Sequence, residues 1–462
     1  MLFCDPIFFL FFGGYLVFHQ LIPKNLMMLL VVAGSLFFYG YWNPIYIPLP
    51  LILVLVTFWA GLKMDGLIYP VARRRWLTFF LVLLFCPLIF YKYLNFIIAN
   101  LNNTFPSFRI QSVRVALPLG ISFITFTLAA YLIDVFRGKF RFEKSLLALL
   151  ASVLFFPHLI AGPIVRPSQL LPQLKRWNPT ITSKFKFGFL LFSIGLFKKL
   201  ALADSISPLV NQAYADLNSS KSAWTSFFAF YGFTLQIFCD FSGYTDMALG
   251  LSWILGIRLP NNFKQPYCSK SLVDFWRRWH ITLSFWLRDY LYIPLGGGRV
   301  SFLKQARNIM ITMTLGGLWH GANWTFVIWG FLHGVGIIIN HAFGKVFPKF
   351  RLPAILSWLI TLHFVALGWV FFRAPNLTIV SELLKGFWLN SWSLENLPKD
   401  YLFASVILCF FAITHRFDRH ALYRLFSHRI STVILGMTVA LIIVTSIVIS
   451  SGSPAEFIYF DF

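Results

Sequence analysis

Charged residues are scarce in this chain of 462 residues. They make up 12% of the sequence, whereas 58% is hydrophobic and 19% is aromatic, including 55 Phe residues. A water-soluble fold would have too little polar surface to cover its core at this composition. The sequence therefore excludes a soluble globular protein and indicates one that uses the lipid bilayer as its solvent.

Acidic residues are the scarcest of the charged groups. Sixteen Asp and Glu residues stand against 39 Lys and Arg residues, which gives a formal net charge of +23. In a soluble domain such a charge would suggest nucleic-acid binding. In a membrane protein, basic residues gather in cytoplasmic loops that face anionic lipids. We therefore expect membrane lipids, and no nucleic acid, as partners of the basic surface.

Cysteine is also rare. The five cysteines are scattered along the chain, with no C-x-x-C motif and no metal-ligand spacing. Their pattern predicts neither a disulfide framework nor a metal site. We expect no bound cofactor.

Long apolar segments dominate the chain. The first, 7–22, lacks a basic leader and a small-residue cleavage site, so it predicts a retained membrane helix. Several later segments are shorter than a spanning helix needs. Breaks at Gly162-Pro163, Pro266 and Gly296–Gly298 predict re-entrant or tilted pieces that pack against protein. We expect an all-α polytopic membrane protein, one domain over residues 1–462, with roughly 10–13 membrane segments.

Three basic stretches predict which side of the membrane is cytoplasmic. They are 73–75, 137–144 and 416–429. Because Lys and Arg accumulate in cytoplasmic loops, we expect all three on that side. Two apolar segments separate the first stretch from the second, which agrees with a single orientation, with the N-terminus outside.

Residues Ser271–Ile293 predict a helix that is too polar to cross lipid. Ser271 and Asp274 match a capping box at its start. On a continuous helix, Asp274 lies one turn before Arg278. The alternative to a functional role is an interfacial amphipathic helix whose charges are solvated. One stripe of this helix would carry Trp276, His280 and Ser284.

His320 lies in the segment GGLWHG, residues 316–321, between two apolar runs. An imidazole at membrane depth is costly unless it has hydrogen-bonding or ionic partners, so an intramembrane histidine is a functional hypothesis. Histidine titrates near neutral pH and can accept a proton from a hydroxyl group. The alternative is a structural histidine that joins two helices through hydrogen bonds.

His280 precedes His320 by 40 residues, so only the fold can bring the two together. We expect His158 and His333 to be mainly structural.

Two acids, Asp240 and Asp246, lie in an otherwise apolar stretch. Buried acids need basic partners, and we expect Arg277 or Arg278 to supply them. A packing role for these acids is at least as well supported as a catalytic one.

Ordered motifs between residues 236 and 334 carry a family resemblance. They are DFSGYTDMA at 240–248, NNFKQPY at 261–267, DFWRRWHITLS at 274–284, WLRDYLYIPLGG at 286–297 and WHG at 319–321. Together they resemble the membrane-bound O-acyltransferase (MBOAT) family, in particular its alginate O-acetyltransferase branch. The related teichoic-acid D-alanylation branch shares the upstream motifs.

The resemblance implies a bowl-shaped helical membrane fold with a central tunnel. It gives His320 the place of the family's invariant histidine and His280 that of the second, upstream histidine. It implies an O-acetyltransferase of the bacterial cytoplasmic membrane. The expected donor is a cytoplasmic thioester such as acetyl-CoA, and the acceptor is a hydroxyl group of an exported surface glycan. A periplasmic or extracellular acetyltransferase is the expected protein partner.

The same interpretation assigns roles to individual residues. His320 is either a general base or a nucleophile that is briefly acylated, and His280 orients or protonates. Substrate or tunnel contacts are expected from Trp276, Trp279, Trp319, Ser284 and Asn323. Donor-binding or structural roles are expected for Arg277, Arg278, Asp274, Asp240 and Asp246.

Three other functions stay open on the sequence. The first is D-alanyl transfer from a carrier protein to teichoic acid. The second is a transporter or channel that uses Asp240, Asp246 and His320 as an ion path, although the sequence has no inverted repeat. The third is a scaffold that only recruits an acetyltransferase, which the retained histidines argue against.

Overall fold

The computed structural model describes residues 1–107, 109–177, 184–215, 222–392, 399–450 and 457–458. Among these residues there are helices, turns and loops but no strand, which confirms the predicted all-α class. The chain forms two compact units, residues 1–189 with 248–260, and residues 190–247 with 261–462. The single domain expected over residues 1–462 stays a prediction.

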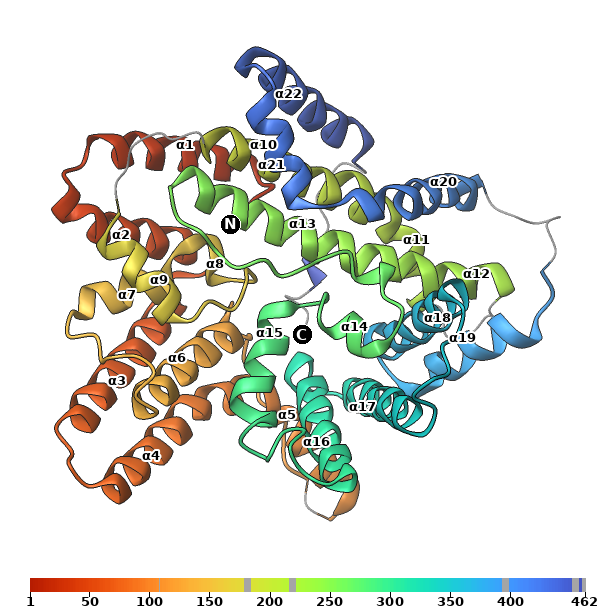
Figure 1. Ribbon diagram of the computed structural model, residues 1–462, viewed down its shortest axis with the longest axis horizontal. Coiled ribbons are helices and arrows are strands. Elements are labelled where there is room, and N and C mark those ends of the chain that lie inside the picture. The colour runs from red at the N-terminus through yellow and green to blue at the C-terminus, as the bar shows by residue number, and fades with distance from the viewer. Residues whose placement is uncertain (108, 178–183, 216–221, 393–398, 451–456, 459–462) are drawn as a thin grey trace. The chain divides into compact units, whose positions relative to one another are not determined.

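The first unit is built around α6 (Ile121–Phe136), almost every residue of which is buried. A helix that is apolar on all sides needs such a buried position. Helices α3 and α4 pack against α6 and lie beside it in Figure 1. The other bounds in this unit are α1 (Pro6–Leu21), η1 (Lys24–Leu26), α2 (Met27–Gly40), η2 (Pro44–Tyr46), α3 (Pro48–Asp65), α4 (Pro70–Leu88), η3 (Ile89–Tyr93), α5 (Leu94–Thr104), α7 (Leu146–Leu154), α8 (Phe156–Leu159) and α9 (Pro167–Lys175).

The second unit contains all the motifs of the predicted catalytic region from residue 261 onward. Its longest helices are α16 (Phe302–His320), α17 (Trp324–Val346) and α18 (Ala354–Arg373). Helices α10 (Lys184–Phe197) and α13 (Phe233–Ile254) each contain a boundary between the units. The remaining bounds are η4 (Lys198–Asp204), α11 (Ser205–Ala215), α12 (Ala223–Phe227), η5 (Phe228–Gly232), η6 (Pro266–Cys268), α14 (Leu272–Trp276), α15 (Ile281–Leu287), η7 (Arg288–Tyr292), α19 (Leu377–Leu389), α20 (Lys399–Thr414), η8 (His415–Phe417), α21 (His420–Arg429) and α22 (Thr432–Ile449).

Several helices are long and apolar enough to cross a membrane. Within the described residues there are five, and a sixth if Tyr401–Phe417 and His420–Arg429, which meet at a 76° bend, form one span. Shorter apolar helices, such as α6, accompany them, as the sequence predicts for tilted or re-entrant pieces. The five are Pro44–Asp65, Pro70–Thr104, Trp324–Val346, Ala354–Arg373 and Thr432–Ile449.

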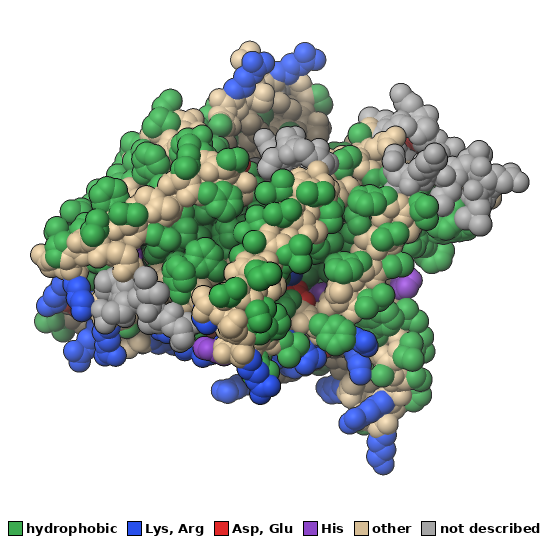
Figure 2. Space-filling model, turned by 90° about the horizontal axis from the view of Figure 1, so that it is seen from above, with side chains coloured by type: hydrophobic (Ala, Val, Ile, Leu, Met, Phe, Trp, Pro, Cys, Tyr) green, Lys and Arg blue, Asp and Glu red, His purple; other side chains and the backbone are tan. Residues whose placement is uncertain are grey.

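Large hydrophobic side chains remain exposed on these helices. Along α22, Val433, Met437, Leu441 and Val444 are all more than half exposed. Figure 2 shows that hydrophobic side chains dominate the face it displays, whereas Lys and Arg side chains gather in separate groups. Such a large exposed apolar surface is expected of a protein that faces lipid.

Candidate active site

The polar helix predicted over Ser271–Ile293 is broken in the structure. Helix α14 ends at Trp276, α15 begins at Ile281, and the π-helical turn η7 follows. Ser271 caps α14 as predicted, since its Oγ accepts a hydrogen bond from the backbone N–H of Asp274 at 3.1 Å. The prediction of one continuous helix, and of a stripe shared by Trp276, His280 and Ser284, is wrong.

A neighbouring loop causes the break. The backbone N–H of Lys264 donates to the carbonyl of Arg278, and that of Ile281 donates to the carbonyl of Asn262, each at 2.9 Å. His280 between them has a φ of +41°, a left-handed conformation that is uncommon for a residue other than glycine. Tertiary hydrogen bonds therefore replace helical ones at this point and turn the His280 side chain inward.

Asn262 fixes the orientation of His280. The Oδ1 atom of Asn262 accepts hydrogen bonds from the backbone N–H of Thr282 at 3.2 Å and from the Thr282 hydroxyl at 2.8 Å. The same oxygen lies 3.2 Å from Nδ1 of His280. Asn262 and His280 are both fully buried. Burial lowers the pKa of His280 to about 3, so its imidazole is neutral at physiological pH.

His320 is the last residue of α16, which packs along α17 (Figure 1). The two helices cross so closely that two glycines are required. A Cβ on Gly317 would lie 2.3 Å from the carbonyl oxygen of Phe326, and a Cβ on Gly330 would lie 2.3 Å from that of Met313. Small residues allow this approach between membrane helices. The crossing holds His320 in a buried position.

The fold brings the two predicted histidines together. The ring centroids of His280 and His320 are 6.3 Å apart, with an angle of 61° between the ring planes. The indole of Trp319 lies 6.1 Å from the His280 ring and 4.9 Å from the His320 ring. Two imidazoles and a tryptophan thus form the centre of the candidate site, and all three belong to the second unit.

Aromatic side chains surround this centre. Trp329 and Phe372 each lie 5.2 Å from the ring of His320. Trp279 is fully buried and lies 4.7 Å from Trp369. An enclosure of this kind keeps water away from a reactive intermediate. Sequence reasoning missed Trp329, Trp369 and Phe372, because nothing in their local sequence distinguishes them from core residues.

Trp276 reaches the same aromatic group through His333. The indole N–H of Trp276 donates to Nδ1 of His333 at 3.3 Å, and the rings of Trp329 and His333 are 4.9 Å apart. His333 therefore connects Trp276 with the surroundings of His320. In the first unit, His158 lies 3.1 Å from the Ser152 carbonyl through its Nε2 atom, an arrangement that suits the structural role expected for it.

Other predicted residues make local contacts. The Ser284 hydroxyl donates to the carbonyl of Trp279 at 3.3 Å. Asn323 caps α17 by accepting from the N–H of Thr325 at 3.1 Å, and its side-chain amide donates to Pro375. These contacts are all with backbone groups, so in this structure Ser284 and Asn323 hold neighbouring segments of the chain in place.

A cavity of about 390 Å³ lies beside the broken helix. Trp276, Arg277 and Ser284 line it, so three predicted residues meet there, together with Arg288 and His341. None of its lining residues is acidic. Arg278 instead pairs with Asp274 at 2.9 Å, one helical turn away as predicted.

The two buried acids of α13 pair with lysines of η4. Asp240 contacts Lys199 at 2.7 Å, and Asp246 contacts Lys198 at 2.7 Å. The expectation that Arg277 or Arg278 would pair with them is therefore wrong. The adjacent lysines at the end of the apolar run 185–197 were the sequence signal for these pairs. Asp204 is a further partner of Lys199, at 2.8 Å.

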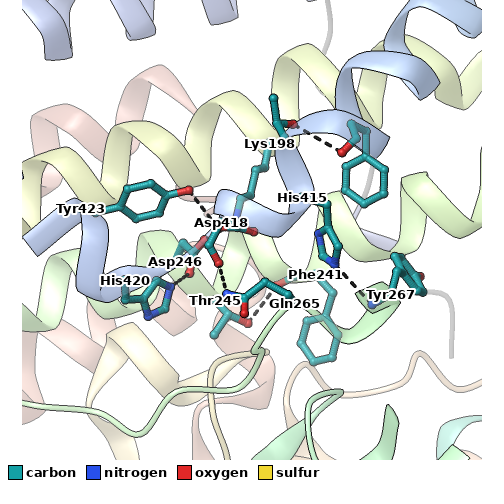
Figure 3. A network of polar contacts seen from close by, with 12 residues as sticks. Lys198, Phe241, Thr245, Asp246, Gln265, Tyr267, His415, Asp418, His420 and Tyr423 are labelled. Carbon is teal, nitrogen blue, oxygen red and sulfur yellow. Dashed lines mark hydrogen bonds and ion pairs between the residues drawn. The ribbon is translucent and has the colours of Figure 1, made fainter. Parts of the chain in front are cut away.

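A polar network extends from Lys198 toward the C-terminal helices (Figure 3). Lys198 also contacts Asp418 at 2.6 Å, and the Tyr423 hydroxyl donates to Asp418 at 2.9 Å. His420 contacts Asp246 at 2.8 Å, and the Gln265 side chain donates to the carbonyl of Asp418. The network ties the loop that carries Asn262 to the segment around Asp418. Both acids of the network, Asp246 and Asp418, have a basic partner, which favours a structural role for them.

Comparison with known proteins identifies the family. The sequence profile of the membrane-bound O-acyltransferase family matches residues 139–381. The probable alginate O-acetylase AlgI of Azotobacter vinelandii is 40% identical over 87% of this chain and 81% of its own length. The peptidoglycan O-acetyltransferase of Helicobacter pylori is 39% identical over 87% of this chain and 82% of its own. The teichoic acid D-alanyltransferase of Bacillus subtilis is 32% identical over 55% and 68%, respectively.

The profile covers the paired histidines, the broken polar helix and the α16–α17 crossing. The helices that can cross a membrane fit the same family. This chain therefore belongs to the membrane-bound O-acyltransferase family and is a multi-pass membrane acyltransferase similar to alginate and peptidoglycan O-acetyltransferases.

Proposed function

We propose that this protein transfers an acetyl group from a thioester donor to hydroxyl groups of an exported cell-surface polysaccharide, in the bacterial cytoplasmic membrane. The observation that carries the proposal is the 6.3 Å approach of the His280 and His320 rings inside an aromatic enclosure. The names of the two relatives with about 40% identity, an alginate O-acetylase and a peptidoglycan O-acetyltransferase, support acetyl as the transferred group.

His320 is the group at which donor and acceptor meet. As a general base, it takes the proton of the acceptor hydroxyl while the oxygen attacks the thioester carbonyl, and the imidazolium then gives this proton to the thiolate that leaves. As a nucleophile, its nitrogen forms the bond to the acetyl carbon, the thiol is released, and the acceptor oxygen then displaces the imidazole. Both routes end in an acetyl ester, a free thiol and an unmodified histidine.

His280 serves in either route as a neutral positioning group. Its contact with Asn262 fixes the ring, and its neighbour Trp319 also touches His320. A neutral imidazole beside the reacting centre can donate or accept a hydrogen bond without adding charge to a buried site.

The donor is acetyl-coenzyme A in the simplest form of the proposal. The cavity lined by Arg277, Arg288 and His341 suits its phosphates, because guanidinium groups bind phosphate through paired hydrogen bonds. Trp276, in the wall of this cavity, connects through His333 and Trp329 to His320. The acyl end would then lie toward the histidines while the nucleotide stays in the basic cavity.

The acceptor receives the acetyl group either directly or through a periplasmic or extracellular acetyltransferase partner. The test is surface-glycan acetylation in cells that express the wild type, His320→Ala or His363→Ala at matched membrane abundance. His363 is an exposed histidine of α18, so its replacement controls for the loss of an imidazole. We expect acetylation to disappear with His320→Ala alone. Acetylation that survives this change would exclude the proposed role.

A further inference from the structure

A second, larger groove lies in the second unit, away from the paired histidines. It has a volume of about 930 Å³ and runs between the first turns of α18 and the last turns of α20. This volume is within the range of sites that hold small-molecule ligands. Its walls are mainly aromatic and aliphatic, with contributions from Tyr231, Leu235, Tyr267, Trp358, Leu408 and Phe411.

The wall of the groove is held in place by hydrogen bonds. The indole N–H of Trp358 donates to the carbonyl of Tyr267 at 2.7 Å. The backbone N–H of Tyr267 donates to Nε2 of His415 at 3.3 Å, and the two rings lie 5.6 Å apart. These contacts join η6, α18 and η8, so the groove is already formed in this structure.

Positive charge gathers at one end of the groove. Lys270 and Arg416 line it and are both exposed, and none of the lining residues is acidic. An apolar groove with a basic end complements a molecule that carries an anionic group on a hydrocarbon chain.

The helix ends show where the groove lies in the membrane. Both α18 and the bent pair that contains α20 are candidate membrane spans. The groove meets the start of α18, just after Lys349 and Arg351, and the end of α20, just before Arg416. Because basic residues flank spans on the cytoplasmic side, the groove opens at the level of the cytoplasmic leaflet. Anionic phospholipids in that leaflet bind basic pockets between spans.

We propose that this groove binds one anionic phospholipid of the cytoplasmic leaflet, with an acyl chain between α18 and α20 and its phosphate beside Lys270 and Arg416. The inference does not depend on the acceptor or donor of the acetyl transfer. Tyr267, in the groove wall, lies 6.0 Å from the ring of Trp279, next in the chain to His280. A bound lipid therefore supports the aromatic layer behind the active site.

Native mass spectrometry of the full-length protein, delipidated in a neutral detergent, provides the test. Phosphatidylglycerol and phosphatidylcholine of identical chain length are titrated separately. We expect phosphatidylglycerol to bind tighter by about tenfold or more, given the usual contribution of each basic residue near an anionic lipid. Equal affinity for the two lipids would overturn the proposal.

Two changes address the two halves of the groove. The double variant Lys270→Glu/Arg416→Glu reverses the charge at its end, and Arg429→Glu reverses an exposed arginine of α21 outside the lining as a control. Ala412→Trp fills the apolar part, and Ile413→Trp adds the same ring at the next residue of α20, which does not line the groove.

We expect both groove variants to lose phosphatidylglycerol binding by about tenfold or more and both controls to retain it. Helical content and elution volume, measured for each variant, show that the fold is intact. Binding that survives Ala412→Trp would place the lipid on the surface and overturn the proposal. Equal loss in Arg429→Glu would show a general charge effect and overturn it as well.

Discussion

A single buried amide orients the upstream histidine of the site. Asn262 accepts two hydrogen bonds from Thr282 and contacts His280 through the same oxygen. We expect Asn262→Ala to lower the turnover rate by up to about 100-fold, because a displacement of about 1 Å near reacting groups has effects of this size. Activity at matched membrane abundance measures it.

Thr282→Val is the matched control for this change. It also removes a buried hydrogen bond to Asn262, from the Thr282 hydroxyl, but leaves the contact with His280 in place. We expect a much smaller loss of activity than in Asn262→Ala. Equal losses in the two variants would mean that Asn262 supports the fold and does not position His280.

The two histidines are expected to act as one unit. His280→Ala should lower activity less than His320→Ala, because in the proposed mechanism His280 only positions groups whereas His320 reacts. The double variant should be no worse than His320→Ala, since effects within one catalytic unit are not additive. Steady-state rates of the three variants test this. Independent, multiplying losses would assign His280 a separate chemical step.

The sequence allowed some of these residues to be predicted and not others. His320 is recognisable in the sequence as an ionisable residue among glycines between two apolar runs, and the family resemblance names His280 as the second histidine. That the two rings meet depends on the fold. Trp329 and Phe372 could not be predicted, because their approach to His320 depends on how α17 and α18 pack. Lys198 and Lys199 were missed as partners of the buried acids. Two adjacent lysines at the end of an apolar run are visible in the sequence, but no local pattern shows which distant acids they contact.

At the scale of elements, the close crossing of α16 and α17 determines where His320 lies. Gly330→Ala would put a Cβ 2.3 Å from the carbonyl oxygen of Met313 and force the helices apart. Overpacking of this kind costs about 1–3 kcal/mol of stability. The shift of His320 should also reduce activity by about 100-fold. Gly344→Ala, in the same helix with open space around it, should leave activity unchanged.

We would measure thermal stability and acetyl transfer side by side for the two glycine variants. Similar activity in Gly330→Ala and Gly344→Ala would mean that the crossing adapts without moving His320.

The broken polar helix illustrates what local sequence does not specify. Ser271 predicted the start of α14 correctly, because capping depends on residues close in the chain. The break before α15 was not predicted, because it results from hydrogen bonds between Asn262 or Lys264 and residues 278–282. Helical periodicity continued through the segment, but tertiary contacts overrode it.

At the scale of the whole molecule, the basic stretches predict orientation. A cysteine at Arg74, Lys139 or Arg429 should resist a membrane-impermeant thiol reagent in intact cells, because all three positions are expected to be cytoplasmic. Cys86, Cys268 and Cys409, which are not buried, are first replaced by Ser. Mass tagging after labelling measures the result.

Thr378→Cys is the control for this experiment. Thr378 lies just after the C-terminal end of α18, whereas Lys349 and Arg351 precede the N-terminal end of this helix. We therefore expect a cysteine at this position to react from outside. If all three basic positions were labelled and position 378 were protected, the predicted orientation would be wrong. The assignment as an acyltransferase would not be affected.

The class of the whole molecule followed from composition, because a chain with 58% hydrophobic and 12% charged residues needs lipid around it. The number of membrane-spanning helices could be predicted less directly from the sequence. Short apolar helices such as α6 read as spanning candidates in sequence, and their length alone does not separate a span from a buried core helix.

Acyl transfer can be measured on purified protein in detergent as the His320-dependent consumption of isotopically labelled acetyl-coenzyme A, with a hydroxyl-bearing glycan present as acceptor. Loss of a general base alone typically slows a reaction by a factor of about 100 to 10,000. We expect wild type and His363→Ala to consume the labelled thioester, and His320→Ala to be slower by about 100-fold or more while remaining folded. Consumption by His320→Ala at the wild-type rate would exclude the proposed role of His320.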